Sequence, residues 1–305
     1  MGNKFLSVLM PVYNSEKYIE DAIKSILSQS HREFEFLIID SSSTDKTAQI
    51  INSFKDERIK YHSIERCPVS ESLNYGLQIA KYDLIVRMDS DDISYPNKFE
   101  VQLKYFENDP SIDILSTQYL LFENNFKFKI NLPTQHVDIY KSLSLHSTIN
   151  HSGVMYKKSI IIDSGAYNYT SSEDYDLWLR IKDKVKFACT SEILMDVRYH
   201  NSSLQRSNKL LYKSEVYKLQ QPYYIKGIEK EFGLTKKEAE IISGWRELFY
   251  GDKNKSRIFW KNPFKYFFDD KRIPIAFLLS YFPIPLVNYI LELRIKHRIK
   301  SFLKF

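Results

Sequence analysis

The chain has 305 residues, which is enough for one large domain or for a domain with an appendage. Hydrophobic residues at 43% and aromatic residues at 15% are ample for a packed core, while two cysteines, Cys67 and Cys189, exclude a disulfide framework and favour a reducing compartment. The formal net charge of +6 is uneven, because residues 252–305 carry 12 Lys/Arg against 4 Asp/Glu and the first 251 residues carry a net charge of −2. The basic character therefore predicts a partner for the C-terminal part, and we do not expect that partner to be nucleic acid.

Short apolar runs alternate with amphipathic segments through the first 110 residues. Four such runs predict strands at Phe5–Met10, Phe34–Ile39, Ile59–Ile64 and Leu84–Met88. The segments between them have helical spacing, and we expect Ser15, the turn Ser41–Thr44 and Ser70 to begin the three helices. Strands that alternate with helices of this length predict an α/β fold with a mainly parallel sheet flanked by helices.

Carboxylates follow two of these strands at the point where each strand ends. Asp40 follows the second strand, and Asp89, Asp91 and Asp92 crowd together after the fourth. In open α/β sheets the ligand lies beyond the carboxyl ends of the strands, and crowded carboxylates repel one another unless a cation or hydrogen-bond donors hold them. Mg²⁺ and Mn²⁺ prefer such oxygen ligands and commonly share them with substrate phosphates.

Two simpler interpretations of this acidic run compete with a cation site. A solvated acidic turn stays open from the local sequence alone. A calcium-binding EF-hand loop that starts at Asp89 is excluded, because Ile93 and Ser94 occupy positions where a ligand and a glycine are needed. The sequence also lacks both glycine-rich phosphate-binding motifs, so a diphosphate bound here would have to be neutralised by a cation.

Four motifs resemble, in order and spacing, the successive signatures of family 2 glycosyltransferases with the GT-A fold. They are Ser7–Asn14 (SVLMPVYN), Ile39–Asp45 (IDSSSTD), Ser72–Gly76 (SLNYG) and Arg87–Ile93 (RMDSDDI). The resemblance implies a Rossmann-like catalytic domain over residues 1–205, with a nucleotide-sugar-binding half at 1–110 and an acceptor and catalytic half at 111–205. The last motif is similar to that of bacterial enzymes that build capsule and O-antigen repeat units.

The same resemblance implies roles for individual residues. The implied donor-binding residues are Pro11, Tyr13, Asp40, Ser41, Asn74, Asp89 and Ser90. Among them Pro11, Tyr13 and Asp40 line the nucleoside pocket, and Asp89 forms with Asp91 the D-x-D motif that binds a divalent cation, Mn²⁺ or Mg²⁺. The donor implied is a nucleoside-diphosphate sugar, usually a UDP-sugar.

Two departures from the family pattern lie in this donor site. The family usually has Asp-Asp-Gly-Ser-Thr-Asp where this chain has Asp40–Asp45 (DSSSTD), so the second Asp, which often faces the base, is Ser41 here. The usual Arg before Asn74 is Leu73, which removes a positive charge expected near the phosphates.

The second half of the chain begins with mixed elements. We expect a helix at Pro96–Phe106, a hairpin of strands, and two later strands; the four strands are predicted at Ile112–Phe122, Phe126–Ile130, Gly153–Tyr156 and Leu194–His200. His146 and His151 flank a polar stretch, where a zinc pair competes with ordinary polar or substrate contacts, and we favour the latter.

Glu173 and Asp174 begin an amphipathic helix that continues through Leu177 and Ile181. Carboxylates in a first turn suit the helix dipole, and that structural explanation is the alternative. The run Glu-Asp-Tyr-Asp-Leu-Trp resembles the catalytic motif of the inverting family members, which implies that Asp174 is the general base for the acceptor hydroxyl, with Glu173 beside it. Partial burial would raise the pKa of such a carboxyl toward working pH.

A histidine follows the last predicted strand of this region. In similar enzymes a histidine at this place approaches the metal or the diphosphate, which makes His200 an implied third ligand beside Asp89 and Asp91. A hydrogen-bonded loop histidine is the alternative.

The C-terminal part, residues 206–305, is predicted to be helical and then aromatic and basic. Residues Ile273–Leu291 lack a formal charge, but three prolines argue against one uninterrupted membrane span. Residues Arg294–Phe305 carry five Lys/Arg and no acid among apolar side chains, which predicts an interfacial anchor on an anionic cytoplasmic membrane surface. A helical subdomain packed on the core, or a homodimer surface, is the alternative.

The resemblance and these features together indicate a metal-dependent enzyme of the cytoplasm, bound peripherally to the inner face of the cell membrane. The resemblance implies that it is an inverting hexosyltransferase that transfers sugar from the nucleotide donor to a glycan or a polyprenyl-diphosphate-linked acceptor. A non-catalytic nucleotide-sugar-binding protein and a metal-dependent nucleotidyltransferase are the competing interpretations. The run Phe5–Met10 is too short for the apolar core of a signal peptide.

Overall fold

The structure is a computed structural model that describes residues 5–123, 126–168, 171–200, 208–266 and 268–281. The chain folds into two compact units. The first, here the sheet unit, contains residues 1–140 and 147–203, and the second, the helical unit, contains residues 141–146 and 204–305. The helical unit therefore takes a short segment from within the sequence of the sheet unit.

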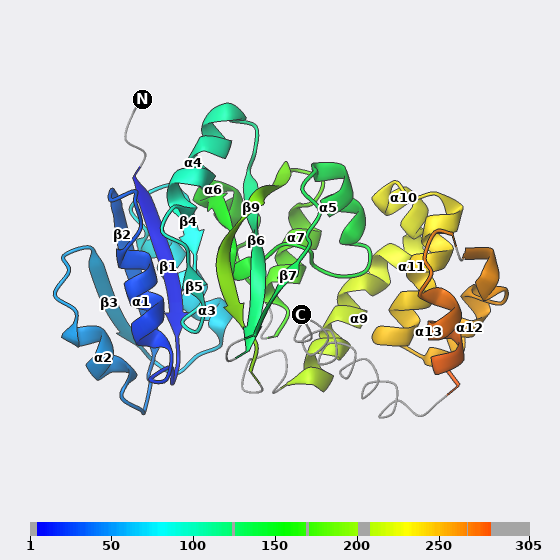
Figure 1. Ribbon diagram of the computed structural model, residues 1–305, viewed down its shortest axis with the longest axis horizontal. Coiled ribbons are helices and arrows are strands. Elements are labelled where there is room, and N and C mark those ends of the chain that lie inside the picture. Colours follow the sequence, from blue (N-terminus) through cyan, green and yellow to red (C-terminus); the bar gives the residue numbers. More distant parts are fainter. Residues whose placement is uncertain (1–4, 124–125, 169–170, 201–207, 267, 282–305) are drawn as a thin grey trace. The chain divides into compact units, whose positions relative to one another are not determined.

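One mixed sheet forms the centre of the sheet unit (Figure 1). Its strands are β1 (Leu6–Val12), β2 (Phe34–Ser41), β3 (Ile59–Ile64), β4 (Leu84–Arg87), β5 (Ile93–Ser94), β6 (Ile114–Glu123), β7 (Phe126–Ile130), β8 (Met155–Lys157) and β9 (Phe187–Arg198). They are ordered β3-β2-β1-β4-β8-β6-β9-β5, with β7 paired to β6. The first four are parallel, β8 runs antiparallel to β4 and β6, and β9 is parallel to β6.

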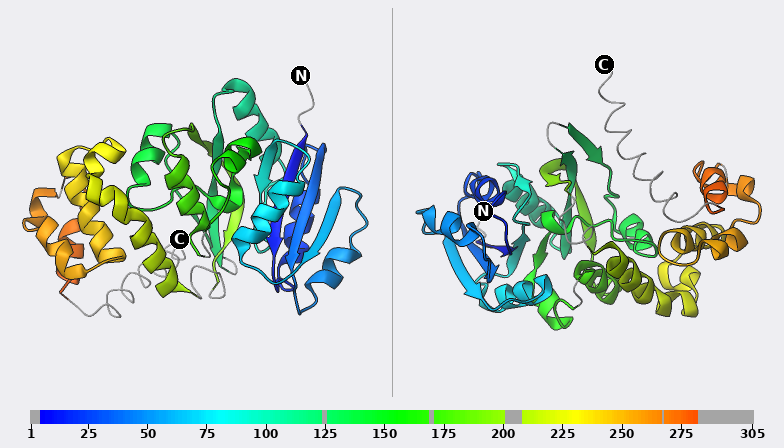
Figure 2. Two further views of the ribbon diagram at one scale, coloured as in Figure 1. Left: turned by 180° about the vertical axis from the view of Figure 1, so that it is seen from behind. Right: turned by 90° about the horizontal axis from the view of Figure 1, so that it is seen from below.

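Helices pack against this sheet from both faces (Figure 2). They are α1 (Ile19–Leu27), α2 (Thr47–Ser53), α3 (Val69–Ile79), α4 (Lys98–Asn108), α5 (His136–Ser142), α6 (Lys158–Asp163) and α7 (Glu173–Ile181), with a short 3₁₀ turn, η1 (His151–Gly153). Because successive side chains of a strand point to opposite faces, a strand covered on both sides is apolar except where a buried polar group has a hydrogen-bond partner. Every residue of β1 is buried, and its one polar side chain, Ser7, donates to Glu35 Oε1 at 2.5 Å.

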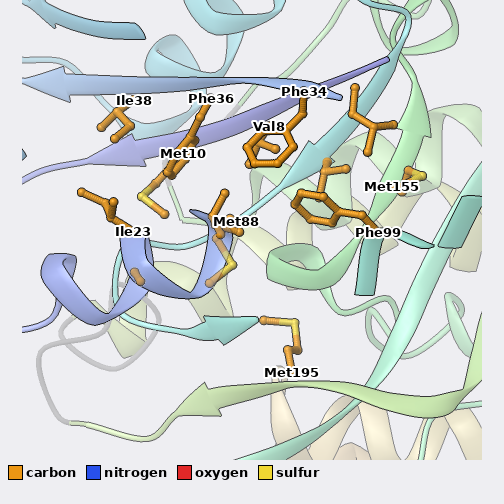
Figure 3. Packing of buried hydrophobic residues seen from close by; sticks show 14 of the residues in the cluster. Val8, Met10, Ile23, Phe34, Phe36, Ile38, Met88, Phe99, Met155 and Met195 are labelled. Atoms are coloured by element: carbon orange, nitrogen blue, oxygen red, sulfur yellow. The ribbon is translucent and has the colours of Figure 1, made fainter. Parts of the chain in front are cut away.

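The core lies between the parallel strands and the helices. Val8 and Met10 of β1 pack beside Phe36 of β2 and Ile23 of α1 (Figure 3). On the other face α3 approaches β1 so closely that a Cβ added at Gly76 would lie 2.1 Å from Leu9 Cδ1. Helices α1 and α3 therefore pack on opposite faces of β1. The predicted site lies at the carboxyl ends of β1 and its neighbouring strands.

The predicted α/β fold with parallel strands, flanking helices and C-terminal helices is confirmed. The hairpin is also confirmed, since β6 and β7 pair antiparallel. The strand predicted from Gly153 begins only at Met155, because residues 151–153 form η1.

Two predicted helix caps are wrong. The helix expected to begin at Ser15 starts at Ile19, and the Ser15 hydroxyl lies 2.7 Å from the hydroxyl of Ser90 instead. The next helix starts at Thr47, whose N–H donates to Asp45 Oδ1, rather than being capped by the serine-rich turn. Both capping hydroxyls are engaged elsewhere, Ser15 with Ser90 and Ser43 with Asp40.

The helical unit is a separate small bundle. Its elements are α9 (Lys209–Lys226), α10 (Ile228–Phe232), α11 (Lys236–Phe249), α12 (Lys253–Phe259), η2 (Pro263–Tyr266) and α13 (Ile273–Leu279). Trp245 and Trp260 cross edge-to-face at 4.9 Å and pack with Ile273 and Ala276 of α13. Thr235 and Glu238 form a capping box at the start of α11.

Residues 141–146 are held by the helices of this bundle. The amide of Gln220 donates to the carbonyl of Leu145 at 2.6 Å, and the Tyr224 hydroxyl donates to the carbonyl of Ser144 at 3.2 Å. The Lys141 ammonium lies 3.1 Å from Glu238 Oε1, and Leu143 is fully buried. These contacts tie the inserted segment to α9 and α11.

No helix among the described residues has the length and apolar character needed to cross a bilayer. Of the predicted run Ile273–Leu291, residues 273–279 form α13, and the part beyond residue 281 lies outside the described residues. The predicted anchor Arg294–Phe305 also lies outside them.

Candidate active site

Three carboxylates converge where β4 ends. Asp89, Asp91 and Asp92 each offer an oxygen, and these oxygens all lie within 4.8 Å of one another. Asp92 is buried, whereas Asp89 and Asp91 are partly exposed. Within the described residues this is the only group of three or more side chains that could share a metal ion, and it includes neither His146 nor His151.

Each carboxylate of this acidic cluster has a partner, and those of Asp91 and Asp92 come from the end of β9 and the residues after it. Asp89 forms an ion pair with the buried Arg87. His200 Nε2 lies 2.7 Å from Asp91 Oδ2. Asp92 Oδ1 accepts the backbone N–H of Arg198 at 2.8 Å. Burial opposes the charged form of Arg87, but the neighbouring Asp89 outweighs it and raises the pKa of Arg87 above its ordinary value.

The acidic cluster fits a divalent cation such as Mn²⁺ or Mg²⁺. Carboxylate oxygens are the ligands that these ions prefer, and the cluster offers three of them from one turn of chain. His200, which the sequence predicts as a third ligand with Asp89 and Asp91, does lie beside Asp91. Asp92 was not among the predicted ligands, although its oxygen completes the group.

The predicted nucleoside-pocket residues gather at the ends of β1 and β2. The register of these parallel strands places Val12 opposite Asp40, between Pro11 and Tyr13. Asp40 is buried, with Oδ1 accepting the Ser43 hydroxyl at 2.6 Å and Oδ2 accepting the Tyr61 hydroxyl at 2.8 Å. Tyr13 is the member of this group whose aromatic ring is exposed.

An arginine that was not predicted joins this group. The guanidinium of Arg66 stacks 3.6 Å from the centre of the Tyr13 ring and donates to the Ser41 hydroxyl at 3.2 Å. The Ser41 hydroxyl also accepts the N–H of Cys67 at 2.8 Å. Ser41 stands where the family pattern usually has its second Asp. Its hydroxyl accepts hydrogen bonds from Arg66 and Cys67 in the loop between β3 and α3.

Asn74 and Ser90 have partners within the sheet unit. The side-chain amide of Asn74 makes two hydrogen bonds of 2.9 Å to the backbone of Tyr167, one to its N–H and one to its carbonyl. The Ser90 hydroxyl pairs with Ser15 at 2.7 Å. In this structure both predicted donor-binding side chains connect chain segments that are distant in sequence.

A second pair of carboxyl groups begins α7. Glu173 and Asp174 are both buried at the N-terminus of the helix. Burial raises the pKa of Asp174 to about 6, although backbone N–H groups of the first turn and the charge of Arg87 act in the opposite direction. Burial and the charge of Asp174 raise the pKa of Glu173 to about 8. With a pKa of about 6, the carboxylate of Asp174 is a competent proton acceptor near neutral pH.

Arg87 and η1 connect the two carboxylate groups. The charge of Arg87 acts on Asp89 and also on Glu173 and Asp174. The N–H of Asp89 donates to the Ser152 hydroxyl of η1 at 3.1 Å. Sequence reasoning overlooked Arg87, although a charged residue inside the otherwise apolar run Leu84–Met88 is a usable signal, because a buried charge requires a partner.

Comparison with known proteins identifies the family. The family model described as "Glycosyl transferase family 2" matches residues 7–166, a stretch that contains the acidic cluster and ends before α7. The chain belongs to glycosyltransferase family 2. This family 2 glycosyltransferase is therefore an enzyme, and the predicted family is confirmed.

Two curated relatives of this family 2 glycosyltransferase come from Escherichia coli. The "O-antigen biosynthesis glycosyltransferase WbnJ" is 34% identical over 71% of this chain and 88% of the relative. The "UDP-Gal:alpha-D-GlcNAc-diphosphoundecaprenol beta-1,3-galactosyltransferase" is 30% identical over 72% of this chain and 82% of the relative. Among solved structures, S. aureus TarS 1–349 in complex with UDP-GlcNAc aligns with a TM-score of 0.61 at 18% identity, over 91% of this chain and 79% of that one. This likeness confirms the GT-A fold.

Proposed function

We propose that this family 2 glycosyltransferase is an inverting, divalent-cation-dependent hexosyltransferase that uses a UDP-sugar and acts on a hydroxyl of a glycan or lipid-linked acceptor in surface polysaccharide synthesis. One observation carries the proposal: the acidic cluster and the buried Glu173–Asp174 pair lie in one unit and share the same buried arginine, Arg87. Glycosyl transfer needs two parts. One is a site that stabilises the diphosphate leaving group, and the other is a group that accepts the proton of the acceptor hydroxyl.

The donor side of the proposed site consists of the acidic cluster and the pocket at the ends of β1 and β2. Asp89 and Asp91, with His200 beside Asp91, would hold the cation. A bound Mn²⁺ or Mg²⁺ supplies charge stabilisation to the departing diphosphate. Tyr13 offers a ring face to the nucleoside, and Arg66 offers N–H donors for oxygen atoms of the base.

On the acceptor side Asp174 is the proposed general base. Its carboxylate takes the proton from the acceptor hydroxyl as that oxygen bonds to the anomeric carbon. The bond from the anomeric carbon to the diphosphate oxygen breaks on the opposite face, so the nucleoside diphosphate leaves and the anomeric configuration inverts. The raised pKa of Asp174 favours this transfer, because it brings the acidity of the base closer to working pH.

The identity of donor and acceptor rests on the curated relatives. One relative that is 30% identical carries in its name a UDP-linked galactose donor and an acceptor on diphosphoundecaprenol. A second, 34% identical, is named for O-antigen biosynthesis. We extend a UDP-hexose donor and a polyprenyl-diphosphate-linked acceptor to this chain on that basis.

A lipid-linked acceptor calls for an enzyme at the cytoplasmic membrane surface, and we propose the helical unit for that role. It exposes large apolar side chains on its last elements, namely Ile258, Phe264, Phe268 and Leu278, which are 63–93% exposed. Lysines 255, 261, 265 and 271 lie among them in the sequence. Apolar side chains among cations are typical of surfaces that bind anionic lipid headgroups.

Replacement of Asp174 by Asn tests the proposed function. Asp174→Asn keeps the shape of the side chain and removes the proton acceptor, so kcat should fall on the order of 10²–10⁴-fold while the Kd for UDP-sugar hardly changes. The matched control is Asp183→Asn, the same change at a surface carboxylate 66% exposed. The readout is donor turnover with a polyprenyl-diphosphate sugar as acceptor.

The products of this assay separate the competing functions. Release of UDP supports glycosyl transfer, whereas release of pyrophosphate would identify a nucleotidyltransferase. Donor binding without either product would identify a non-catalytic binding protein. Unchanged kcat in Asp174→Asn would remove the general base from the proposal.

A further inference from the structure

The turn η1 contacts both carboxylate groups through two adjacent residues. Ser152 accepts the N–H of Asp89 in the acidic cluster at 3.1 Å. His151 Nδ1 lies 3.7 Å from Glu173 Oε1 at the start of α7. The turn itself is closely packed, because a Cβ at Gly153 would lie 2.4 Å from Thr117 Oγ1. The imidazole of His151 thus lies between Glu173 on one side and Tyr167 on the other.

The hydrogen bonds behind His151 favour one of its two neutral tautomers. Tyr167 donates its hydroxyl proton to the oxygen of Tyr156 at 3.1 Å. Its oxygen is then left as an acceptor for His151 Nε2, which lies 3.2 Å away. A neutral imidazole has a single N–H, so His151 with a proton on Nε2 presents a bare lone pair at Nδ1. That lone pair faces Glu173 Oε1.

We propose that His151 is a positioning residue that holds Glu173 in its protonated form, so that the Glu173–Asp174 pair carries one negative charge, located on Asp174. At 3.7 Å the lone pair on Nδ1 repels a Glu173 carboxylate and so favours the uncharged, protonated acid. The inference deepens the proposed function and rests on it, because it explains how Asp174 rather than Glu173 becomes the base.

The charges around the pair agree with this assignment. Burial and the neighbouring Arg87 lower the pKa of His151 well below its usual value and keep the imidazole neutral. The charged groups that act on Glu173 are Asp174 and Asp89, which favour its protonated form, and Arg87, which opposes it. The balance with burial raises the pKa of Glu173, so that it is protonated at neutral pH.

The tautomer of His151 gives a direct test that needs no substrate. In protein labelled with ¹⁵N-histidine, the His151 signals are identified by their absence from His151→Gln. We expect a protonated Nε2 and an unprotonated Nδ1 at pH 7. A proton on Nδ1, or on both nitrogens, would overturn the proposal.

The charge of Glu173 is tested by changing the residue behind the histidine. Tyr167→Phe removes the acceptor of the Nε2 proton, so His151 is free to place its proton on Nδ1 and stabilise a Glu173 carboxylate. With ¹³C-labelled glutamate, the titration midpoint of Glu173 should fall by about one pH unit or more, against no change in Tyr140→Phe. An unchanged midpoint in folded Tyr167→Phe would contradict the proposal. Tyr156→Phe is the second variant. It frees the Tyr167 hydroxyl proton for His151 Nε2, so the titration midpoint of Glu173 should fall here as well.

Activity separates this inference from the proposed function. Glu173→Gln supplies an N–H in place of the acid proton, so its kcat should fall less than tenfold, whereas Asp174→Asn should lose at least 100-fold. Equal large losses would show that Glu173 acts as a carboxylate and would refute the inference alone. Retained turnover in Asp174→Asn would refute the proposed function.

Discussion

Repulsion between neighbouring carboxylates dominates the electrostatics at the end of β4. Asp89, Asp91 and Asp92 place carboxylate oxygens within 4.8 Å of one another, and two buried basic residues act on them: Arg87, which pairs with Asp89, and Lys98, which interacts with the charge of Asp92. Two basic residues do not neutralise three carboxylates together with the diphosphate of the donor, so a divalent cation would be attracted strongly to the site.

Removal of one carboxylate should weaken cation binding directly. Asp91→Asn deletes a ligand charge and the partner of His200, so the Kd for Mn²⁺ measured by calorimetry with UDP present should rise at least tenfold, and turnover should fall in parallel. Excess chelator should abolish turnover of the unmodified enzyme. Asp163→Asn, at an exposed carboxylate outside the site, is the control. Full activity in chelator would refute the cation-dependent mechanism.

The pKa of Asp174 predicts the pH dependence of the reaction. A base must be ionised before it can accept a proton, and burial raises the pKa of Asp174 to about 6. With saturating substrates, kcat should therefore be constant between pH 7 and the pKa of Glu173, which is about 8, and fall about tenfold per pH unit well below pH 6. The residual activity of Asp174→Asn should lack this decline. A midpoint near 4 in the unmodified enzyme would show that Asp174 is not buried in the working complex.

At the scale of elements, the sequence predicted what local patterns can encode. Apolar runs and helical spacing located the parallel strands and the helices between them, because burial on both faces requires those patterns. The serine-rich turn failed as a cap for a local reason, because Ser43 donates to Asp40 only three residues before it. Ser15 failed for a reason that local sequence cannot show, since it bonds to Ser90 across the fold. The same holds for Ser152 and His151, whose partners lie far along the chain. The predicted roles of the site residues remain predictions.

The approach of α3 to β1 can be tested at one glycine. Gly76→Ala places a Cβ against Leu9, which is fully buried, so the free energy of unfolding should fall by about 1–3 kcal/mol. In the background of Leu9→Ala, which removes the contacting methyl groups, Gly76→Ala should cost less than it does alone. Urea denaturation followed by circular dichroism gives the values. Unchanged stability in the single variant would show that α3 packs less closely than described.

For the whole molecule, the important feature is the uneven distribution of charge and exposed apolar surface. The first 251 residues carry a net charge of −2, and the remaining residues carry an excess of eight positive charges. The helical unit also exposes Phe264 and Phe268. An enzyme with these two properties in one region should bind anionic lipid surfaces in a manner that salt weakens.

Liposome flotation tests this membrane proposal. Full-length protein should float with anionic vesicles at low salt and dissociate at high salt, and it should not float with zwitterionic vesicles. A chain ending at Tyr281 keeps Ile273 and Ala276 of the Trp245 core and should float less. Phe264→Ser with Phe268→Ser should reduce flotation further without loss of fold. Full-length protein that stays at the bottom under all conditions would favour a homodimer surface, to be checked by light scattering.

The segment at residues 141–146 has a consequence for how the protein is made. The ribosome releases this segment before it has synthesised α9 and α11, yet the carbonyls of Ser144 and Leu145 accept hydrogen bonds from α9, and Lys141 pairs with Glu238 of α11. Until then the nascent chain must carry an unsatisfied stretch in the middle of its catalytic part, where chaperones and proteases can reach it. The segment can thus be completed only after α9 and α11 have been synthesised, and we expect that exchange of these helices with those of a relative requires exchange of this internal hexapeptide as well.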